Sequence, residues 1–281
     1  RSRIIGLVVA YLQNQFYPEA LEKLSAALQS RGYHVLVFLT AHTQGDITDV
    51  IEEILDYQVD GIIAASVALS SELAERCQAE GVPLVLFNRS QDDTALSSVT
   101  SDNYSGGRKV AEFFIANGHR RIGYIAGWEG ASTQRDREAG FIDALGEAGL
   151  KLQARGVGDF KTDKARDAAL AMFSGHDIPD AVFVSNDHMA FSVMDTLRFE
   201  LGLRVPEDVS VVGYDDVLAA SWRGYDLTTV RQPAGQMVDE TVDILLAQIE
   251  GEDTTPRRIE IDGPIVVRGS ARCTTSTKGR V

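Results

Sequence analysis

Short, nearly continuous runs of apolar residues recur along the chain. They are rich in valine and isoleucine and read "IIGLVVA" (4–10), "HVLVFLT" (34–40), "GIIAAS" (61–66), "PLVLFN" (83–88), "RIGYIAG" (121–127), "AVFVSN" (181–186) and "VSVVGY" (209–214). Strands that helices cover on both faces have this pattern, because no position along them faces water. We therefore expect each run to form a buried strand of a parallel sheet.

Between these runs, apolar residues are spaced as on one face of a helix. Three stretches show this spacing: Leu21, Leu24 and Leu28; Ala190, Val193, Leu197 and Leu201; and Val238, Val242, Leu245 and Ile249. Pro18 suits the first turn of the first helix, and Gly202 and Gly251 are suitable stops for the other two. Strands that alternate with helices predict an α/β fold with a parallel sheet.

The alternation of strands and helices runs twice. A first series covers 4–104, and a second begins at "GHRRIGYIAG" (118–127) without a low-complexity linker. We therefore expect two similar α/β lobes. Ligands of open parallel sheets bind beyond the carboxyl ends of the strands. Asp215, which directly follows the apolar run 209–214, is accordingly expected at a ligand site.

Charge and cysteine content narrow the possible partners. The 281 residues include 41 acidic and 27 basic side chains, a net charge of −14. Binding to nucleic acid needs a basic surface, so we expect these residues not to bind it by themselves. Cys77 and Cys273 form neither a metal-type spacing nor a disulfide framework, which fits a reducing cytoplasm. The first residues show no signal-peptide cleavage site, and the run 4–10 is too short to span a membrane.

Common catalytic and cofactor motifs are absent from the sequence. It has no GxxxxGK[ST] loop, no strand-linked GxGxxG, no HExxH and no GxSxG. The five histidines are scattered without metal spacing, so we expect no metal and no cofactor. The stretch "DNYSGG" (102–107) is similar to a glycine-rich phosphate loop. A helix start capped by Asp102 or Ser105 explains it better.

Four longer stretches carry a more specific pattern: "NQFYPEALEKL" (14–24), "TQRDREAGFIDAL" (133–145), "AVFVSNDHMAFSVMDTLRFELGLRVPEDVSVVGYDD" (181–216) and "LTTVRQPAGQM" (227–237). They resemble the effector-binding core of the LacI/GalR family of bacterial regulators, over nearly the whole chain. The resemblance implies the periplasmic-binding-protein-like type I α/β fold, in which three crossovers join two doubly wound parallel-sheet lobes. The crossovers would fall near 118–121, 230–232 and 259–263. One lobe would hold 1–118 and 232–259, and the other 119–231 and 260–274 with a last strand at 265–270; 275–281 would be a tail.

The resemblance also implies partners. Family members are typically homodimers that bind a small-molecule effector such as a sugar, a sugar phosphate or a nucleoside. Effector binding changes lobe closure and thereby the affinity for operator DNA. The family's N-terminal helix-turn-helix headpiece and hinge helix are not visible in a sequence that opens at Arg1. We therefore expect operator binding only through the headpiece of a longer parent protein, and no membrane association.

The family's pattern assigns ligand-binding roles to individual residues. Asp215 would bind ligand hydroxyl or amine groups, and Arg137 would reach into the ligand cleft. The other matching positions are Asn186, Asp187, Phe160, Phe16, Tyr17, Thr133 and Asp102. These residue types suit a polyol, because charged groups bind hydroxyls strongly and an aromatic ring covers the apolar face of a sugar.

Each assignment has a purely structural alternative. Asp215 could cap a helix expected after 217–221, for which Asp216 is the better cap, and Arg137 could pair with Asp136 or Glu138 on a helix surface. Asn186 and Asp187 could cap the helix that contains Met189. Phe160 could belong to the core, and Phe16 and Tyr17 could pack on the helix that starts near Pro18. We favour ligand contact for Asp215 and Arg137.

Two other function classes are compatible with the fold. A periplasmic sugar-binding protein of a transport system has the same architecture, but "VPEDVSVVGYDD" followed by "LTTVRQP" favours a regulator. A glycosidase needs two carboxylates at a defined separation, which Asp187, Asp215 and Asp216 could supply. We expect a cytoplasmic effector-binding and dimerisation core that is not an enzyme.

Overall fold

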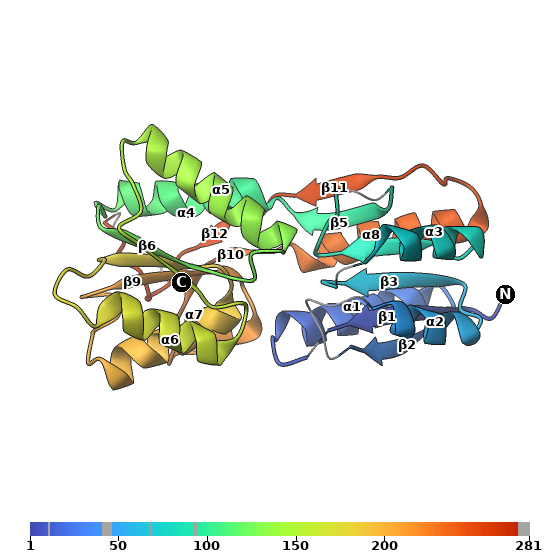
Figure 1. Cartoon of the computed structure of the whole chain (residues 1–281), viewed down its shortest axis with the longest axis horizontal. Coiled ribbons are helices and arrows are strands. Elements are labelled where there is room, and N and C mark those ends of the chain that lie inside the picture. The colour runs from blue at the N-terminus through green and yellow to red at the C-terminus, as the bar shows by residue number, and fades with distance from the viewer. Residues whose placement is uncertain (11, 41–46, 68, 93–94, 275–281) are drawn as a thin grey trace. The chain divides into compact units, whose positions relative to one another are not determined.

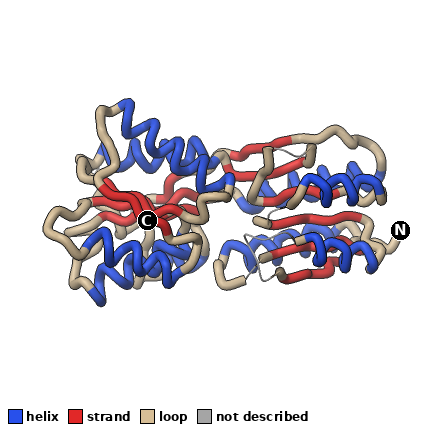
Figure 2. The backbone as a smooth tube through the Cα atoms, in the orientation of Figure 1, coloured by secondary structure: helices blue, strands red, loops and turns tan. Residues whose placement is uncertain are grey.

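The computed structural model describes residues 1–10, 12–40, 47–67, 69–92 and 95–274. The chain divides into two compact units. Unit 1 consists of Arg1–Ser101 and Pro233–Ile261, and unit 2 consists of Asp102–Gln232 and Asp262–Val281. The expected tail 275–281 lies outside the described residues. In Figure 2 the strands of each unit lie between helices.

Unit 1 is built on a six-stranded sheet with the order β11-β5-β4-β3-β1-β2, in which every pair is parallel (Figure 1). Its strands are β1 (Ile4–Val9), β2 (His34–Leu39), β3 (Gly61–Ala65), β4 (Leu84–Phe87), β5 (Ser97–Ser101) and β11 (Arg258–Ile261). The four apolar runs predicted in this part of the chain are β1 to β4, which confirms the parallel sheet. Burial is confirmed for β1, β3 and β4, but β2 is an edge strand in which Val37 and Leu39 are exposed, so its predicted burial is wrong.

Helices cover both faces of the unit 1 sheet. On one face, α2 (Thr48–Asp56) and α3 (Ser71–Ala79) pack on Ile62 and Ala64 of β3 through Ile51 and Leu73. On the other face, α1 (Phe16–Ser30) packs beside α8 (Ala234–Glu250), whose Leu245 approaches Gly61 of the same strand. The strand alternates its side chains between the two faces, which is why a continuous apolar run is needed.

Unit 2 repeats this plan with the order β12-β10-β9-β8-β6-β7. Its strands are β6 (Ile122–Ala126), β7 (Ala154–Val157), β8 (Ala181–Val184), β9 (Ser210–Asp215), β10 (Thr228–Arg231) and β12 (Ile265–Val266). Only β12, on β10, is antiparallel among the described strands of this sheet. Each sheet contains the doubly wound order 2-1-3-4-5 of its own strands, so the predicted pair of similar α/β lobes is confirmed.

Two helix layers enclose the unit 2 sheet. On one face, α6 (Thr162–Phe173) and α7 (Asp187–Asp195) share an apolar cluster with Val182 and Val211. On the other, α4 (Asn103–Ala116) and α5 (Ser132–Glu147) share a second cluster with Tyr124 and Phe183. A π-helical turn, η1 (Thr196–Glu200), extends α7, and a short 3₁₀ turn, η2 (Leu218–Ser221), follows β9.

The structure places the first unit boundary after Ser101, not near residue 118. Residues 102–118 contain α4, which packs on α5 and contributes Val110 and Phe114 to the unit 2 core. The spacing of apolar residues predicts that a helix is buried, but not which of two sheets covers it. The other two boundaries follow Gln232 and Ile261, within two residues of the expected crossovers.

No helix within the described ranges is both long and apolar enough to cross a membrane.

Candidate functional site

Polar side chains gather where the strands of unit 2 end. Ser185, Asn186 and Asp187 directly follow β8, Asp215 is the last residue of β9, and Gln232 directly follows β10. Because neighbouring parallel strands end at the same edge of a sheet, these residues lie together at the edge where α/β folds bind ligands.

Arg137 of α5 lies in the middle of this edge and is only 2 % exposed. Its Nε donates to Asn103 Oδ1 at 2.9 Å, and its Nη1 donates to the backbone oxygen of Ser185 at 2.8 Å. The guanidinium lies over the ring of Tyr214, 3.7 Å from its centroid, a favourable cation–π position. The alternative of a surface arginine is therefore wrong.

Asp215 faces Arg137 and is also buried, with 6 % exposure. Its Oδ1 accepts from Gln232 Nε2 at 2.6 Å and lies 3.7 Å from Arg137 Nη2. The backbone φ of Asp215 is 128°, a conformation that costs a non-glycine residue free energy. Such strain is typical of functional sites, because the surrounding fold must hold it in place.

Asp216 does not cap a helix, so that prediction is wrong. Only the short turn η2 follows, and no described side chain caps it. The Asp216 carboxylate instead pairs with Arg231 Nε at 2.8 Å and with Arg268 Nη2 at 2.7 Å. Both arginines come from segments that are distant in sequence, which explains why the local pattern suggested a cap.

Asp187 is fully buried and binds two neighbouring segments. Its Oδ1 accepts from Thr229 Oγ1 at 2.6 Å, and its Oδ2 accepts from the backbone N–H of Val217 at 3.0 Å. Burial raises the pKa of the Asp187 carboxyl, and the charge of Asp215 raises it further. A Cβ at Gly213 would lie 2.3 Å from Asp187 Oδ1, so the glycine of "VGYDD" makes room for this carboxyl.

Two polar candidates are helix caps. Asn186 Oδ1 accepts from the backbone N–H of Met189 at 2.9 Å and caps α7. Asp102 caps α4, with Oδ1 accepting from the N–H of Ser105 at 3.1 Å, which confirms the predicted helix start at "DNYSGG". Thr133 is buried in the first turn of α5.

The aromatic candidates all pack against the protein. Phe160 follows β7, is half-buried, and packs on the cluster beneath α6 and α7. In unit 1, Phe16 and Tyr17 are buried in the first turn of α1. The Phe16 ring stacks on Phe87 with the centroids 6.2 Å apart. These contacts agree with the alternative in which the three rings support the fold, and their predicted contact with a ligand stays a prediction.

The sequence pattern does not identify several residues of the two carboxyl edges. In unit 2 they are Asn103, Ser185 and Gln232. In unit 1, Asn88 follows β4 and donates from Nδ2 to Ser66 Oγ, after β3, at 2.8 Å. Asn88 and Ser66 directly end the runs "PLVLFN" and "GIIAAS", so the rule that selected Asp215 could have found them.

Two of the three carboxylates at the unit 2 edge are engaged by other groups of the protein. Both oxygens of Asp187 accept hydrogen bonds from the protein, and Asp216 is held between two arginines. This leaves Asp215 without a second available carboxylate for acid–base chemistry. Over the part of the chain that the structure describes, no three acidic, histidine or cysteine side chains are placed to hold a metal ion.

Comparisons with known proteins match a family model over more than half of the chain and individual relatives over nearly all of it. Residues 111–271 match the family described as a periplasmic binding protein-like domain. The HTH-type transcriptional repressor PurR of Vibrio vulnificus (strain CMCP6) is 30% identical over 274 residues, which cover 96% of this chain and 82% of that repressor. A complex of the transcriptional regulator CelR with cellobiose has a TM-score of 0.86 at 31% identity and covers 96% of this chain and 85% of that one. The lac repressor dimer bound to operator and the anti-inducer ONPF has a TM-score of 0.85 at 25% identity, covering 97% and 95%.

Proposed function

Because the chain belongs to the LacI/GalR family of transcriptional regulators and forms their periplasmic-binding-protein-like core, we propose that it binds a small effector at the carboxyl edge of the unit 2 sheet. Effector binding would change the arrangement of the two units and thereby control operator binding by the regulator. The observation that carries the proposal is the buried pair of Arg137 and Asp215, which the protein holds in fixed positions without a direct hydrogen bond.

Several features of this edge support a ligand there. The Oε1 atom of Gln232 is buried without a hydrogen-bond partner among the described residues. A buried acceptor without a partner costs about 1–3 kcal/mol, which a ligand donor can recover. The strained backbone of Asp215 also costs free energy, and such strain is typical of residues that a fold holds in position for binding.

We propose that the effector is an uncharged polar molecule of the sugar or sugar-like class. Arg137 and Asp215 already neutralise each other, so a charged ligand would leave an uncompensated charge. Adjacent hydroxyl groups can donate to Asp215 and Gln232 and accept from Arg137. The similar CelR core was solved with cellobiose, which makes sugars the first candidates.

The relatives also bear on the alternative of a periplasmic sugar-binding protein. Those described above are named as transcriptional repressors or regulators, which supports a regulator over a transport protein. Cytoplasmic location, homodimer formation and the absence of catalysis are part of the same proposal.

A thermal-shift screen of neutral sugars, sugar phosphates and nucleosides tests the proposal. A ligand at 100 times its Kd should stabilise the fold by about 2.7 kcal/mol. Hits should then be tested on Arg137→Lys and on Arg135→Lys, an exposed arginine of the same helix. Binding that is unaffected by Arg137→Lys would place the effector elsewhere.

A further inference from the structure

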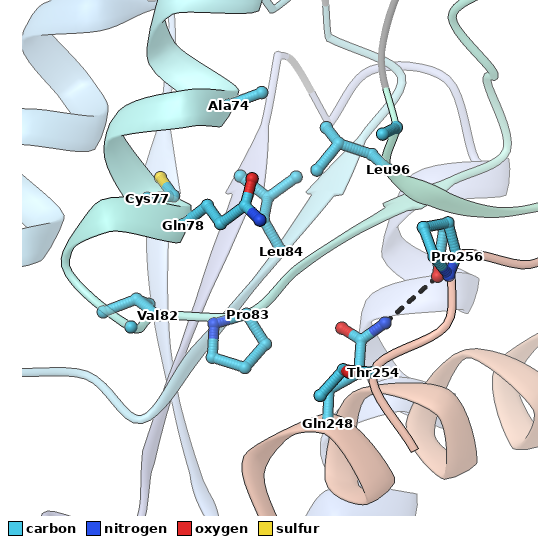
Figure 3. Close-up of a pocket in the computed structure, with 13 residues that line it drawn as sticks. Ala74, Cys77, Gln78, Val82, Pro83, Leu84, Leu96, Gln248, Thr254 and Pro256 are labelled. Carbon is cyan, nitrogen blue, oxygen red and sulfur yellow. Dashed lines mark hydrogen bonds between the residues drawn. The ribbon is translucent and has the colours of Figure 1, made fainter. Parts of the chain in front are cut away.

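Unit 1 contains a pocket of about 470 Å³ at the amino-terminal ends of β4 and β5. Its floor includes Leu84 and Ser97, the first residues of these strands. Figure 3 shows α3 on one side, with Ala74, Cys77 and Gln78, and α8 on the other, with Gln248. The opposite ends of the same strands carry Asn88 and the β5–α4 crossover, so this pocket is separate from the carboxyl edge of the sheet.

The size and lining of the pocket fit a small molecule. Small-molecule sites typically occupy about 300–1,000 Å³ and are mostly apolar with a few polar groups. Here the apolar surface comes from both sides of the pocket and from the segment before β5: Ala74, Val82, Pro83, Leu84, Ala95, Leu96 and Pro256. The polar groups are the Gln78 and Gln248 amides and the Ser97 and Thr254 hydroxyls.

None of the 13 described lining residues carries a charge, in a chain that is 24% charged. A charged ligand would lose its hydration here without gaining an ion pair, which is costly. Burial raises the pKa of the Cys77 thiol to about 11, so this side chain is a neutral part of the wall. The pocket therefore selects against ions and for uncharged molecules.

The two glutamines provide the specific contacts. Gln248 Nε2 donates to Ser97 Oγ at 3.1 Å, the hydrogen bond that is dashed in Figure 3. The same Oγ accepts from the backbone N–H of Arg257 at 3.1 Å. This contact orients the Gln248 amide and leaves its carbonyl oxygen and second N–H for a ligand. Gln78 extends from α3 toward the same space and makes no side-chain hydrogen bond to another described residue.

We propose that this pocket is a second ligand site, which takes an uncharged molecule with a cyclic apolar body and one carboxamide group. The ring would lie on Leu84 and Leu96, and the carboxamide would exchange hydrogen bonds with Gln248 and Gln78. This site does not depend on the proposed effector site, which is built from unit 2 residues.

Benzamide is a suitable probe, and benzoate is its matched anionic control. Titration of the isotope-labelled protein, followed by NMR, should shift the side-chain amides of Gln78 and Gln248 and the backbone amide of Ser97 in a saturable way. A ligand of this size should bind with a Kd on the order of 1–10 mM. Benzoate should leave these signals unchanged at the same concentrations.

Two variants separate the pocket from the surrounding surface. Gln78→Trp should fill the pocket and abolish the benzamide shifts of Gln248 and Ser97. Glu75→Trp, on an exposed position of the same helix that does not line the pocket, should preserve them. Gln248→Leu should weaken benzamide binding by about threefold or more while the fold is kept. No saturable shift with benzamide, equal binding of benzoate, or unchanged binding to Gln78→Trp would each overturn the proposal.

Discussion

The guanidinium of Arg137 and the carboxylate of Asp215 lie 3.7 Å apart at their closest nitrogen and oxygen, although both side chains are almost completely buried. Each is held by other partners: Arg137 by Asn103 and Ser185, and Asp215 by Gln232. Opposite charges at this distance neutralise each other, while their remaining hydrogen-bonding capacity can serve a ligand. This relationship underlies the first two predictions.

Asp215→Asn should weaken effector binding by about tenfold or more, because it replaces charge-assisted hydrogen bonds with neutral ones. The asparagine oxygen can still accept from Gln232. Arg137 would nevertheless lose its buried counter-charge, so the free energy of unfolding should fall by about 1–3 kcal/mol. Calorimetry with a hit from the sugar screen and a urea titration measure the two effects. Asp216→Asn is the matched control, since this carboxylate pairs with Arg231 and Arg268 instead of Arg137, so affinity should be unchanged.

Arg137→Lys keeps the charge but removes the planar group. An ammonium cannot donate to Asn103 and Ser185 in the geometry of a guanidinium fork and cover the Tyr214 ring at the same time. We expect affinity to fall by about 10- to 100-fold and stability by about 1–3 kcal/mol. Calorimetry and urea unfolding of this variant beside Arg135→Lys measure both. Normal affinity with lowered stability would mean that Arg137 only supports the fold.

The pattern of apolar runs identifies the strands that consist mainly of apolar residues, but it does not identify the strands that are rich in polar residues. The strand β5 reads "SSVTS" and is fully buried, because hydroxyl groups such as that of Ser97 are hydrogen-bonded to α8 and to the segment before β11. Partners from distant segments cannot be read from a local pattern. The strands β7 and β10 are short and contain arginine, and they are missed for the same reason.

The site residues likewise differ in whether a local sequence pattern identifies them. Asp215 is found because it ends a strand that the apolar pattern identifies, and the family resemblance supplies Arg137. Gln232 directly follows β10 and Asn103 begins α4, and neither element has a clear local signal. The sequence also cannot tell that Asp216 meets two arginines, since Arg231 and Arg268 lie 15 and more residues away along the chain.

Asp187→Asn should change how stability depends on pH. The native pKa of Asp187 is raised, so the folded protein keeps a proton that the unfolded chain releases above its ordinary value of 3.8. Stability of the wild type is therefore lost as pH rises from that value toward the raised native pKa. Asparagine can accept from Val217 and donate to Thr229 without titrating. The variant's free energy of unfolding relative to wild type should rise by up to about 1.4 kcal/mol per pH unit in this interval.

Urea unfolding of both proteins at pH 5, 6, 7 and 8 measures this difference. Titrating groups distant from Asp187, such as the buried His119, contribute equally to the two proteins and cancel. A difference that stays constant across the series would contradict a raised pKa for Asp187.

A homodimer is expected for residues 1–281. The similar lac repressor was solved as a dimer on its operator, and a two-fold symmetric regulator reads two half-sites. Sedimentation velocity at tens of micromolar should give one species with twice the mass of the chain. A single monomeric species at that concentration would count against the proposal that this core forms the dimer.

Gly107→Ala should disrupt the site without touching a ligand. A Cβ at Gly107 of α4 would lie 2.0 Å from the backbone oxygen of Arg137 in α5, so the two helices would have to separate. Asn103 of α4 also binds the Arg137 side chain, so the separation would displace that guanidinium. We expect a loss of about 1–3 kcal/mol in stability from overpacking and a lower effector affinity.

Gly146→Ala is the matched control, because a Cβ there meets no described atom within 4 Å and alanine favours the helix by up to about 1 kcal/mol. Urea unfolding and calorimetry on both variants test the argument. If Gly107→Ala binds the effector as tightly as Gly146→Ala, the contact between α4 and α5 does not position Arg137.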